Sequence, residues 1–296
     1  MSRHAPALVV LLFGWLVVAA PACSQNLIPD GDFDLNVTGW NDPGSVLSWS
    51  PIDAADESGS GSARLRYAGA NANSGVGAGR CVPIVAGRTY YLAARVLIPA
   101  GQARTGSGNL FFSFYSGENC SGARSDSPNL QATAPGTWSS LMTSATAPAG
   151  KLSAYVVMNV MKTEAGGSFD VHVDDLAFGT CIDGPTSLCL DNQRFLVRAT
   201  FRTAAGGPLG TAESVPLRAD SGLFWFFGPE NLELLVKVLD GCPINARHWV
   251  FLAATTDVEY HLEITDTATG AVKTYSNPLG VLSAARSDVD AFSGCD

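Results

Sequence analysis

The chain has 296 residues, of which 46% are hydrophobic and only 15% are charged, and its formal net charge is -9 at pH 7. This acidic balance argues against nucleic acid or an anionic membrane surface as a partner. The 31 glycines and the sparse charge are typical of an extracellular β-rich protein. The length is sufficient for two ordinary domains.

The N-terminus has the features of a signal peptide. Residues 1–4 are short and basic, and an almost unbroken apolar run follows over residues 7–20. This run is shorter than the roughly 18 residues of a membrane-spanning helix, and Ala20-Pro21-Ala22 fits a small-residue cleavage site. Residues 1–22 are therefore predicted to direct export of a mature chain without a transmembrane segment. Cys23 leaves a lipoprotein anchor as the alternative, although the usual upstream Leu is missing.

Several segments alternate between apolar and other residues, a pattern that predicts half-buried antiparallel strands. These segments are residues 89–98, 109–115, 194–202 and 258–265. In residues 232–238, Glu233 and Lys237 are four apart, as on a helix, but every second residue is Leu or Val, which favours a strand. Turn-forming residues separate the segments, and no amphipathic helix of three turns follows the signal peptide. The fold class is predicted to be all-β.

Six cysteines remain when Cys23 is set aside, and none forms a C-x-x-C pair. An even number in an exported chain predicts disulfides. Cys81 and Cys120 flank two predicted strands, and we expect them to bridge. The other four permit three pairings, among which Cys189 with Cys242 is favoured because each adjoins a predicted strand. These four are Cys181, Cys189, Cys242 and Cys295.

A domain boundary is predicted near Gly179-Thr180. A terminal strand at residues 171–178 precedes it, and a linker-like stretch at residues 181–186 follows it. Two of the six cysteines lie before the boundary and four lie after it, so each part can close its own bridges. We therefore expect one domain over residues 26–179 and a second over residues 181–296.

Distinctive motifs stand at the two ends of the first domain. Residues 26–34 read N-L-I-P-D-G-D-F-D, Gly39-Trp40 follows soon after, and residues 173–176 read V-D-D-L. The domain resembles the CenC-like carbohydrate-binding modules, which begin N-L-I-x-N-G-x-F-E, carry G-W soon after and end V-D-D-V. The resemblance covers residues 26–178. It implies a galactose-binding-like β-jelly-roll sandwich that binds polysaccharide.

The resemblance also implies a structural calcium ion. Members of the family hold it between the first and last strands with carboxylate and carbonyl oxygens, the ligands that a hard cation requires. Asp32, Asp34 and Asp175 are the candidate ligands. The alternative is that they are ordinary turn and edge aspartates.

Sugar binding needs aromatic rings and planar polar side chains on a sheet face or at its rim. Tyr91 and Arg95 share one strand face, and Tyr155 and Asn159 share another. Core packing is the alternative for each aromatic, and it is favoured for Trp40, Phe112 and Phe114. The candidate carbohydrate-binding residues are Trp49, Tyr67, Tyr91, Arg95, Tyr115, Tyr155 and Asn159.

The second domain resembles a β module appended to various secreted bacterial proteins, whose activity the resemblance does not indicate. Four consecutive aromatics within residues 223–227 are compatible with a sticky surface, but a strand buried on both faces is favoured. Residues 258–275 predict a hairpin around a turn at residues 266–270. We expect an immunoglobulin-like β-sandwich.

No catalytic motif is present, because the sequence contains neither H-E-x-x-H nor G-x-S-x-G. A glycosidase needs two carboxylates, which Glu118, Glu164, Asp170 and Asp174 supply in principle. The sequence predicts a secreted or periplasmic polysaccharide-binding protein without catalysis. The alternatives are an adhesion or structural protein of the cell surface or matrix, and an accessory part of a glycoside hydrolase system.

Overall fold

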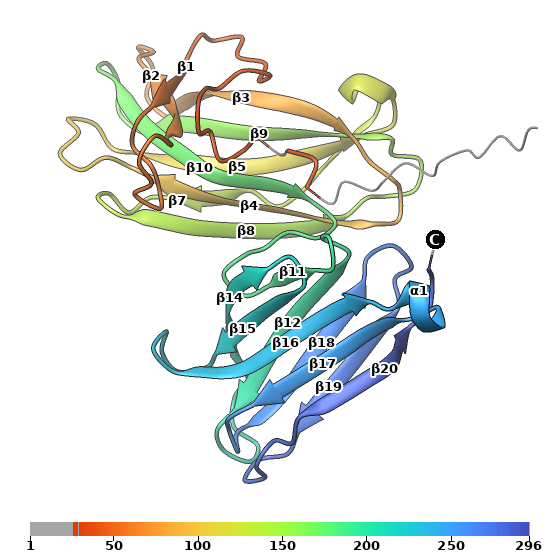
Figure 1. Ribbon diagram of the computed structural model, residues 1–296. Coiled ribbons are helices and arrows are strands. Elements are labelled where there is room, and N and C mark those ends of the chain that lie inside the picture. The colour runs from red at the N-terminus through yellow and green to blue at the C-terminus, as the bar shows by residue number, and fades with distance from the viewer. Residues whose placement is uncertain (1–25, 29, 296) are drawn as a thin grey trace, which may run out of the picture.

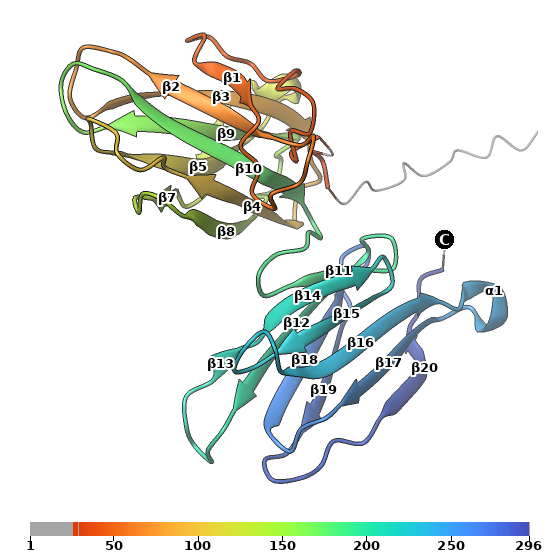
Figure 2. The same ribbon diagram turned by 60° about the vertical axis from the view of Figure 1, so that its left-hand side comes forward.

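The computed structural model describes residues 26–28 and 30–295, which form two β-sandwiches in succession along the chain (Figures 1 and 2). The described part is nearly all strand, so the expected all-β class is confirmed. The predicted signal peptide and Cys23 lie outside the described residues. Within the described residues, no helix has the length and apolar character needed to cross a membrane.

The first sandwich is the expected β-jelly roll, with two antiparallel sheets packed face to face. One sheet has the order β1-β2-β10-β4-β8, with strands Leu47–Ser50 (β1), Ser62–Tyr67 (β2), Phe169–Gly179 (β10), Thr89–Leu97 (β4) and Trp138–Thr146 (β8). The other has the order β3-β9-β5-β6, with strands Ser74–Pro83 (β3), Ser153–Lys162 (β9), Gly106–Tyr115 (β5) and Arg124–Asp126 (β6). Leu130–Ala132 (β7) also pairs with β5. The 3-10 helix Glu118–Cys120 (η1) lies between β5 and β6 in the chain.

Every second residue of β4 and β5 points into the core of the first sandwich, as the alternation predicted. Phe112 and Phe114 are buried, and the Phe112 ring lies 4.9 Å from that of Phe178 on the facing sheet. Trp40 packs against the same core as a partly buried side chain. The core roles expected for these aromatics are thus confirmed.

The two ends of the first sandwich lie side by side. The Leu27 amide donates to the Phe178 carbonyl at 2.6 Å, and the Leu176 amide donates to the Gly31 carbonyl at 2.8 Å. A Cβ on Gly31 would stand 1.7 Å from the Leu176 carbonyl oxygen, so no larger residue fits there. The N-terminal motif therefore contains a glycine because its backbone touches β10.

The second sandwich also joins two antiparallel sheets. One contains Leu188–Leu190 (β11), Phe195–Arg202 (β12), Glu259–Asp266 (β18) and Val272–Asn277 (β19) in that order, with Gly210–Thr211 (β13) beside β12. The other contains Glu213–Arg218 (β14), Ser221–Trp225 (β15), Leu232–Asp240 (β16), His248–Ala254 (β17) and Arg286–Phe292 (β20) in that order. A one-turn helix, Cys242–Asn245 (α1), connects β16 and β17. The strands predicted at residues 194–202 and 232–238 and the hairpin predicted at residues 258–275 are confirmed.

The strand order of the second sandwich differs from that of an immunoglobulin domain, in which the second strand pairs with the fifth. Here β12 pairs with β18, the first strand of the returning hairpin. The strands β14 to β17 form a continuous meander that β20 extends. Alternation in a sequence marks the strands but not their partners, so the sequence predicted the sandwich and not this order.

The aromatic run at residues 223–227 is buried on one face only. Phe224 and Phe226 are buried in the core, whereas Leu223 and Trp225 point outward and are half-buried. Phe227 is 55% exposed. The expectation of a strand covered on both faces is therefore wrong.

Three disulfides are formed. Cys81 pairs with Cys120 as expected. The expected pairing of Cys189 with Cys242 is wrong, because Cys189 bridges to Cys181 and Cys242 bridges to Cys295. The chain turns back between residues 181 and 189 and brings their Cα atoms within 5.5 Å, a spacing that a disulfide spans. Proximity to a strand did not reveal this local turn.

Each sandwich has its own hydrophobic core, one built from residues between 28 and 178 and the other from residues between 188 and 292. Among the described residues, no disulfide joins the two cores. A small cluster of Cys181, Cys189 and Leu196 packs against Tyr91 of β4 and lies between them. Separate folding of residues 26–179 and 181–296 as domains stays a prediction.

One buried histidine makes the first sandwich sensitive to acid. His172 on β10 is 3% exposed, and its Nδ1 lies 3.0 Å from the Ser62 hydroxyl. Burial, reinforced by the Arg64 charge and opposed by Asp170, lowers the pKa of His172 from 6.5 to about 4. A lowered pKa means that this neutral ring stabilises the fold above pH 6.5 and that the stabilisation is lost as the pH falls through 4.

Wild type is expected to lose stability between pH 6.5 and pH 4 because His172 resists protonation in the fold. We expect this loss to be smaller in His172→Gln, by up to about 3 kcal/mol. Urea unfolding at the two pH values measures this loss. The matched control is His261→Gln, because His261 is an exposed histidine of the second sandwich. An unchanged pH dependence in His172→Gln would contradict the assignment.

Candidate functional site

Three of the seven candidate binding residues share one outer surface of the first sandwich. Tyr155 and Asn159 lie on β9, and Tyr115 ends β5. Their neighbours Val156 and Met158 are fully buried, so alternation directs Tyr155 and Asn159 away from the core. The outer face of the sheet β3-β9-β5-β6 is the candidate site.

The edge strand β3 leaves this outer face open because its outward positions include Gly75, Gly77 and Gly79. A Cβ on Gly79 would stand 2.4 Å from the Tyr155 ring, so the ring lies directly over this glycine. The Tyr155 hydroxyl accepts a hydrogen bond from the Asn41 side chain at 3.2 Å. Tyr155 is thus held as an aromatic platform against the sheet edge.

Two hollows open on the outer face. One, of about 480 Å³, is bordered by residues that include Asn41, Gly79, Arg80, Tyr115 and Tyr155. The other, of about 360 Å³, is bordered by residues that include Asn109, Phe111, Arg124, Asp126, Asn129 and Asn159. Tyr155 and Asn159 are four residues apart on one strand, about 13 Å, so the hollows follow each other along β9.

Side-chain amides supply the polar groups of the second hollow. Asn109 and Asn159 are directly paired across β5 and β9. The Asn109 amide donates to the Ser107 hydroxyl at 3.0 Å and accepts from Asn129 at 3.4 Å. The Asn159 amide makes no hydrogen bond to another residue of the described chain. An amide in this state offers both a donor and an acceptor to a ligand hydroxyl.

The charged groups at the hollows are ion-paired. Arg80 lies 2.5 Å from Asp30, and Arg124 lies 2.5 Å from Asp126. The hydrogen bond from Arg124, helped by one from Ser113, lowers the pKa of Asp126. Asp126 is also the only carboxylate that borders either hollow within the described residues. The site can therefore stack and hydrogen-bond a ligand, but it lacks the two carboxyl groups of a glycosidase.

Tyr91 and Arg95 lie on β4 in the other sheet and do not join the candidate site. The Tyr91 ring packs against Leu196 and lies 4.7 Å from the guanidinium carbon of Arg198, both from the second sandwich. Arg95 lies 3.6 Å from the Asp175 carboxylate. Tyr91 therefore contributes to the contact between the two sandwiches.

Trp49 and Tyr67 are also outside the candidate site. The Trp49 indole on β1 donates to the Phe33 carbonyl at 2.7 Å. The Tyr67 hydroxyl donates to Ser74 at 2.9 Å, and the ammonium of the buried Lys162 lies 5.5 Å from the Tyr67 ring. These contacts tie both aromatics to other parts of the first sandwich, and Trp49 is 39% exposed.

The three candidate calcium ligands do not converge as a group of carboxylates. Asp175 faces Arg95, whereas Asp34 accepts a hydrogen bond from Ser60 at 2.6 Å. Burial and the neighbouring Asp34 charge raise the pKa of Asp32. Among the described residues, the one group of three ligand side chains with atoms within 4.8 Å of one another lies in the second sandwich. Calcium bound by Asp32, Asp34 and Asp175 stays a prediction.

Most of the second hollow was not predicted from the sequence. Asn109 and Phe111 alternate with the core residues of β5, so their outward direction was legible in the pattern. Arg124 and Asp126 belong to a three-residue strand, which is too short to show a period. The pairing of β6 with β5 brings Arg124 and Asp126 to the same hollow as Asn109, and the sequence does not show this pairing.

Comparison with known proteins gives similarity at the level of solved structures. A family 16 carbohydrate-binding module is 21% identical with a TM-score of 0.38, over 52% of this chain and 99% of that chain. A family 61 module solved with β-1,4-galactotriose is 11% identical with a TM-score of 0.34, over 53% of this chain and 99% of that chain.

A third structure is larger than the matched region. It contains the family 22 binding and family 10 hydrolase modules of xylanase 10B from Clostridium thermocellum, solved with xylohexaose. It is 15% identical with a TM-score of 0.40, and the match covers 53% of this chain but only 29% of that chain. No family model and no curated protein matches the chain.

Proposed function

We propose that the protein is an exported, CenC-like polysaccharide-binding protein without catalytic activity, and that the outer face of β3-β9-β5-β6 is its binding site. The observation that carries the proposal is the Tyr155 ring, which lies over Gly79 on the outer face of the sheet. An aromatic ring on a flat polar surface stacks on the C–H face of a sugar, and nearby amides bind its hydroxyls.

The arrangement of the two hollows favours a chain of neutral sugars over a single sugar. The aromatic platform at Tyr155 and the amides at Asn159 and Asn109 are successive features along β9 and β5. Both arginines at the hollows are already paired with aspartates, which leaves no unpaired cation for an acidic sugar. We therefore expect the ligand to be a neutral linear polysaccharide.

The positions of the candidate carboxylates favour binding without catalysis. Asp126 stands alone among the acids that border the described hollows. The Asp170 carboxylate is bound by Arg64 at 2.6 Å. Asp174 is 1% exposed, and its oxygens accept backbone hydrogen bonds from Ala54 and Asp175. Neither acid borders the two hollows, so the described hollows hold one carboxylate where a glycosidase uses two.

Export is supported by the disulfides together with the predicted signal peptide. Three disulfides persist only where the surroundings are oxidising, as in the periplasm or outside the cell. A binding protein in that place is suited to hold polysaccharide for a separate hydrolase or at a surface.

The test is a binding screen with the whole mature chain. Affinity gel electrophoresis in soluble β-glucan, xylan and galactan, with pull-down on insoluble cellulose, measures retention against bovine serum albumin. We expect retardation in at least one neutral polysaccharide and none in an acidic one such as polygalacturonate. Absence of retention on every neutral glycan would overturn the proposal and favour an adhesion or structural role.

A further inference from the structure

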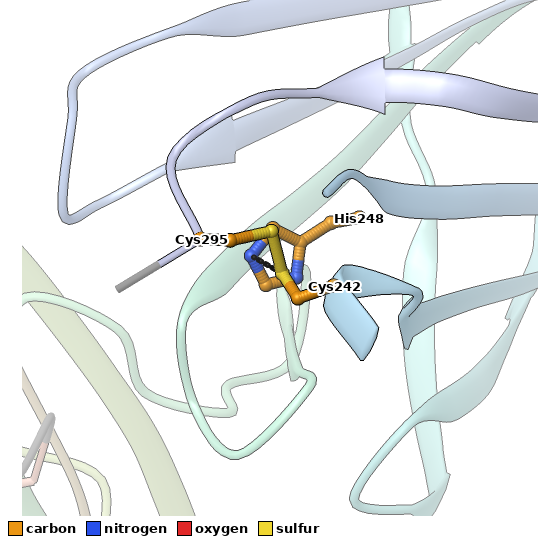
Figure 3. A group of neighbouring side chains, drawn as sticks. All are labelled: Cys242, His248 and Cys295. Carbon is orange, nitrogen blue, oxygen red and sulfur yellow. Dashed lines mark hydrogen bonds between the residues drawn. A yellow bond between two sulfur atoms is a disulfide. The ribbon is translucent and has the colours of Figure 1, made fainter. Parts of the chain in front are cut away.

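A buried histidine contacts one disulfide of the second sandwich (Figure 3). His248, the first residue of β17, is 4% exposed, and its Nε2 lies 3.5 Å from the Sγ of Cys242. Cys242 begins α1, and its partner Cys295 follows β20. On the other side of the ring, Nδ1 lies 2.8 Å from the Asp191 carboxylate. The three groups form a line from carboxylate through imidazole to sulfur.

The geometry fixes the direction of the hydrogen bonds. A disulfide sulfur and a carboxylate are both acceptors, so both contacts are hydrogen bonds when the imidazole carries a proton on each nitrogen. Asp191 orients the ring and balances its charge. The ring then directs its Nε2 proton at Cys242 Sγ.

We propose that the Cys242–Cys295 bridge is a thiol–disulfide exchange site for an external dithiol, with His248 as proton donor and Asp191 as positioning residue. Exchange is faster when the leaving thiolate is stabilised, and the imidazolium beside Cys242 provides this stabilisation. This exchange site lies in the second sandwich and does not depend on glycan binding.

The reaction balances as a two-electron exchange. One thiolate of the dithiol attacks Cys295 Sγ and forms a mixed disulfide, while the Cys242–Cys295 bond breaks and its electron pair leaves on Cys242. His248 Nε2 gives this thiolate its proton and regains one from water. The second thiolate of the dithiol then attacks the mixed disulfide and releases Cys295, which is protonated by water. The dithiol ends as a disulfide and the bridge as two thiols.

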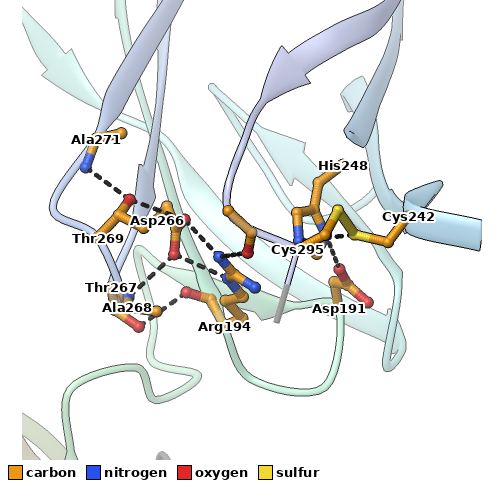
Figure 4. Close-up of polar contacts among 11 residues, drawn as sticks. Asp191, Arg194, Cys242, His248, Asp266, Thr267, Ala268, Thr269, Ala271 and Cys295 are labelled. Carbon is orange, nitrogen blue, oxygen red and sulfur yellow. Dashed lines mark hydrogen bonds and ion pairs between the residues drawn. A yellow bond between two sulfur atoms is a disulfide. The ribbon is translucent and has the colours of Figure 1, made fainter. Parts of the chain in front are cut away.

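The surroundings of the site contain further charges. Asp240, at the end of β16, accepts a hydrogen bond from the Cys242 amide at 2.8 Å. Arg194, before β12, binds the carbonyl of Gly294 next to Cys295 at 2.7 Å (Figure 4). Asp191, Asp240 and Arg194 are thus the charged groups that surround the site. Arg194 also holds the chain end in place while the bridge opens.

The chain provides an internal reference for the test. Cys81 and Cys120 form a half-buried disulfide like that of Cys242 and Cys295, but no histidine within the described residues contacts it. The ratio of the two reduction rates therefore isolates the effect of His248. The ionisation of the reductant cancels in this ratio because both bridges meet the same thiolate concentration.

The experiment exposes the native full chain to limiting dithiothreitol, quenches with acid, alkylates the thiols and quantifies each bridge by peptide mass spectrometry. At pH 7 we expect Cys242–Cys295 to be reduced at least about tenfold faster than Cys81–Cys120. A ratio near one overturns the proposal.

Two variants separate chemistry from structure. His248→Gln should bring the ratio close to one, and Asp191→Asn should give an intermediate ratio. His261→Gln, at the exposed histidine of β18, should match wild type. A wild-type ratio in His248→Gln overturns the proposal. If that variant fails to fold, the wild-type ratio still decides, because a value near one overturns the proposal.

Discussion

Replacing Tyr155 by alanine is expected to weaken polysaccharide binding about 10- to 100-fold, which is the effect of losing a central aromatic anchor. The ring covers Gly79 and borders the larger hollow, so its removal takes away the platform without opening the core. Tyr155→Phe retains the ring and loses only the hydrogen bond from Asn41. We therefore expect a change of about threefold or less for Tyr155→Phe. Isothermal titration with the retained polysaccharide measures both variants.

The matched control for this prediction is Phe227→Ala. Phe227 is an aromatic side chain that is 55% exposed and lies in the second sandwich, away from the outer face. Its loss should leave the affinity at the wild-type value. Wild-type affinity in a folded Tyr155→Ala would place the glycan elsewhere, even if the protein binds one.

The sequence predicted the strands because burial of one face imposes a period of two. In β4 the buried residues Tyr90, Leu92, Ala94 and Val96 are those that the alternation assigned to the core. The same reasoning placed β16 as a strand against the helical spacing of Glu233 and Lys237. Strand partners are set by long-range packing, and alternation is the same for any partner. The order of the second sandwich therefore had to come from the structure.

The candidate site was predictable only in part for the same reason. Tyr155 and Asn159 share a face because they are four apart on one strand, which the sequence shows directly. The division between the outer faces of the two sheets is not visible in the sequence. Tyr91 was therefore grouped with Tyr155, although it faces the second sandwich.

The line from Asp191 through His248 to Cys242 joins residues up to 57 positions apart. The three belong to a turn after β11, the start of β17 and the start of α1. No spacing rule connects such segments, and the expected pairing of Cys189 with Cys242 directed attention to another bridge. Only the antiparallel packing of the second sandwich reveals the contact.

A buried ion pair anchors the chain end of the second sandwich. Asp266 is fully buried, and both of its carboxylate oxygens accept hydrogen bonds from Arg194 at 2.9 Å (Figure 4). Thr269 donates to the same carboxylate at 2.9 Å. Burial alone would raise the pKa of Asp266, but these hydrogen bonds outweigh it and lower the pKa. The charged pair therefore stabilises the fold above pH 3.8, and the stabilisation is lost as the pH falls below that value.

We expect Asp266→Asn to destabilise the second sandwich by about 3 to 5 kcal/mol at pH 7, because it removes the carboxylate charge that balances the buried Arg194 guanidinium. The corresponding fall in melting temperature is about 10 to 20 °C. Differential scanning calorimetry measures this fall, which should shrink as the pH falls below 3.8, because the carboxylate of the unfolded wild type then gains a proton. The control is Asp290→Asn, because Asp290 pairs with Arg247 but is 76% exposed. Loss of an exposed pair costs about 0 to 1 kcal/mol, so equal effects of the two variants would refute a special role for burial.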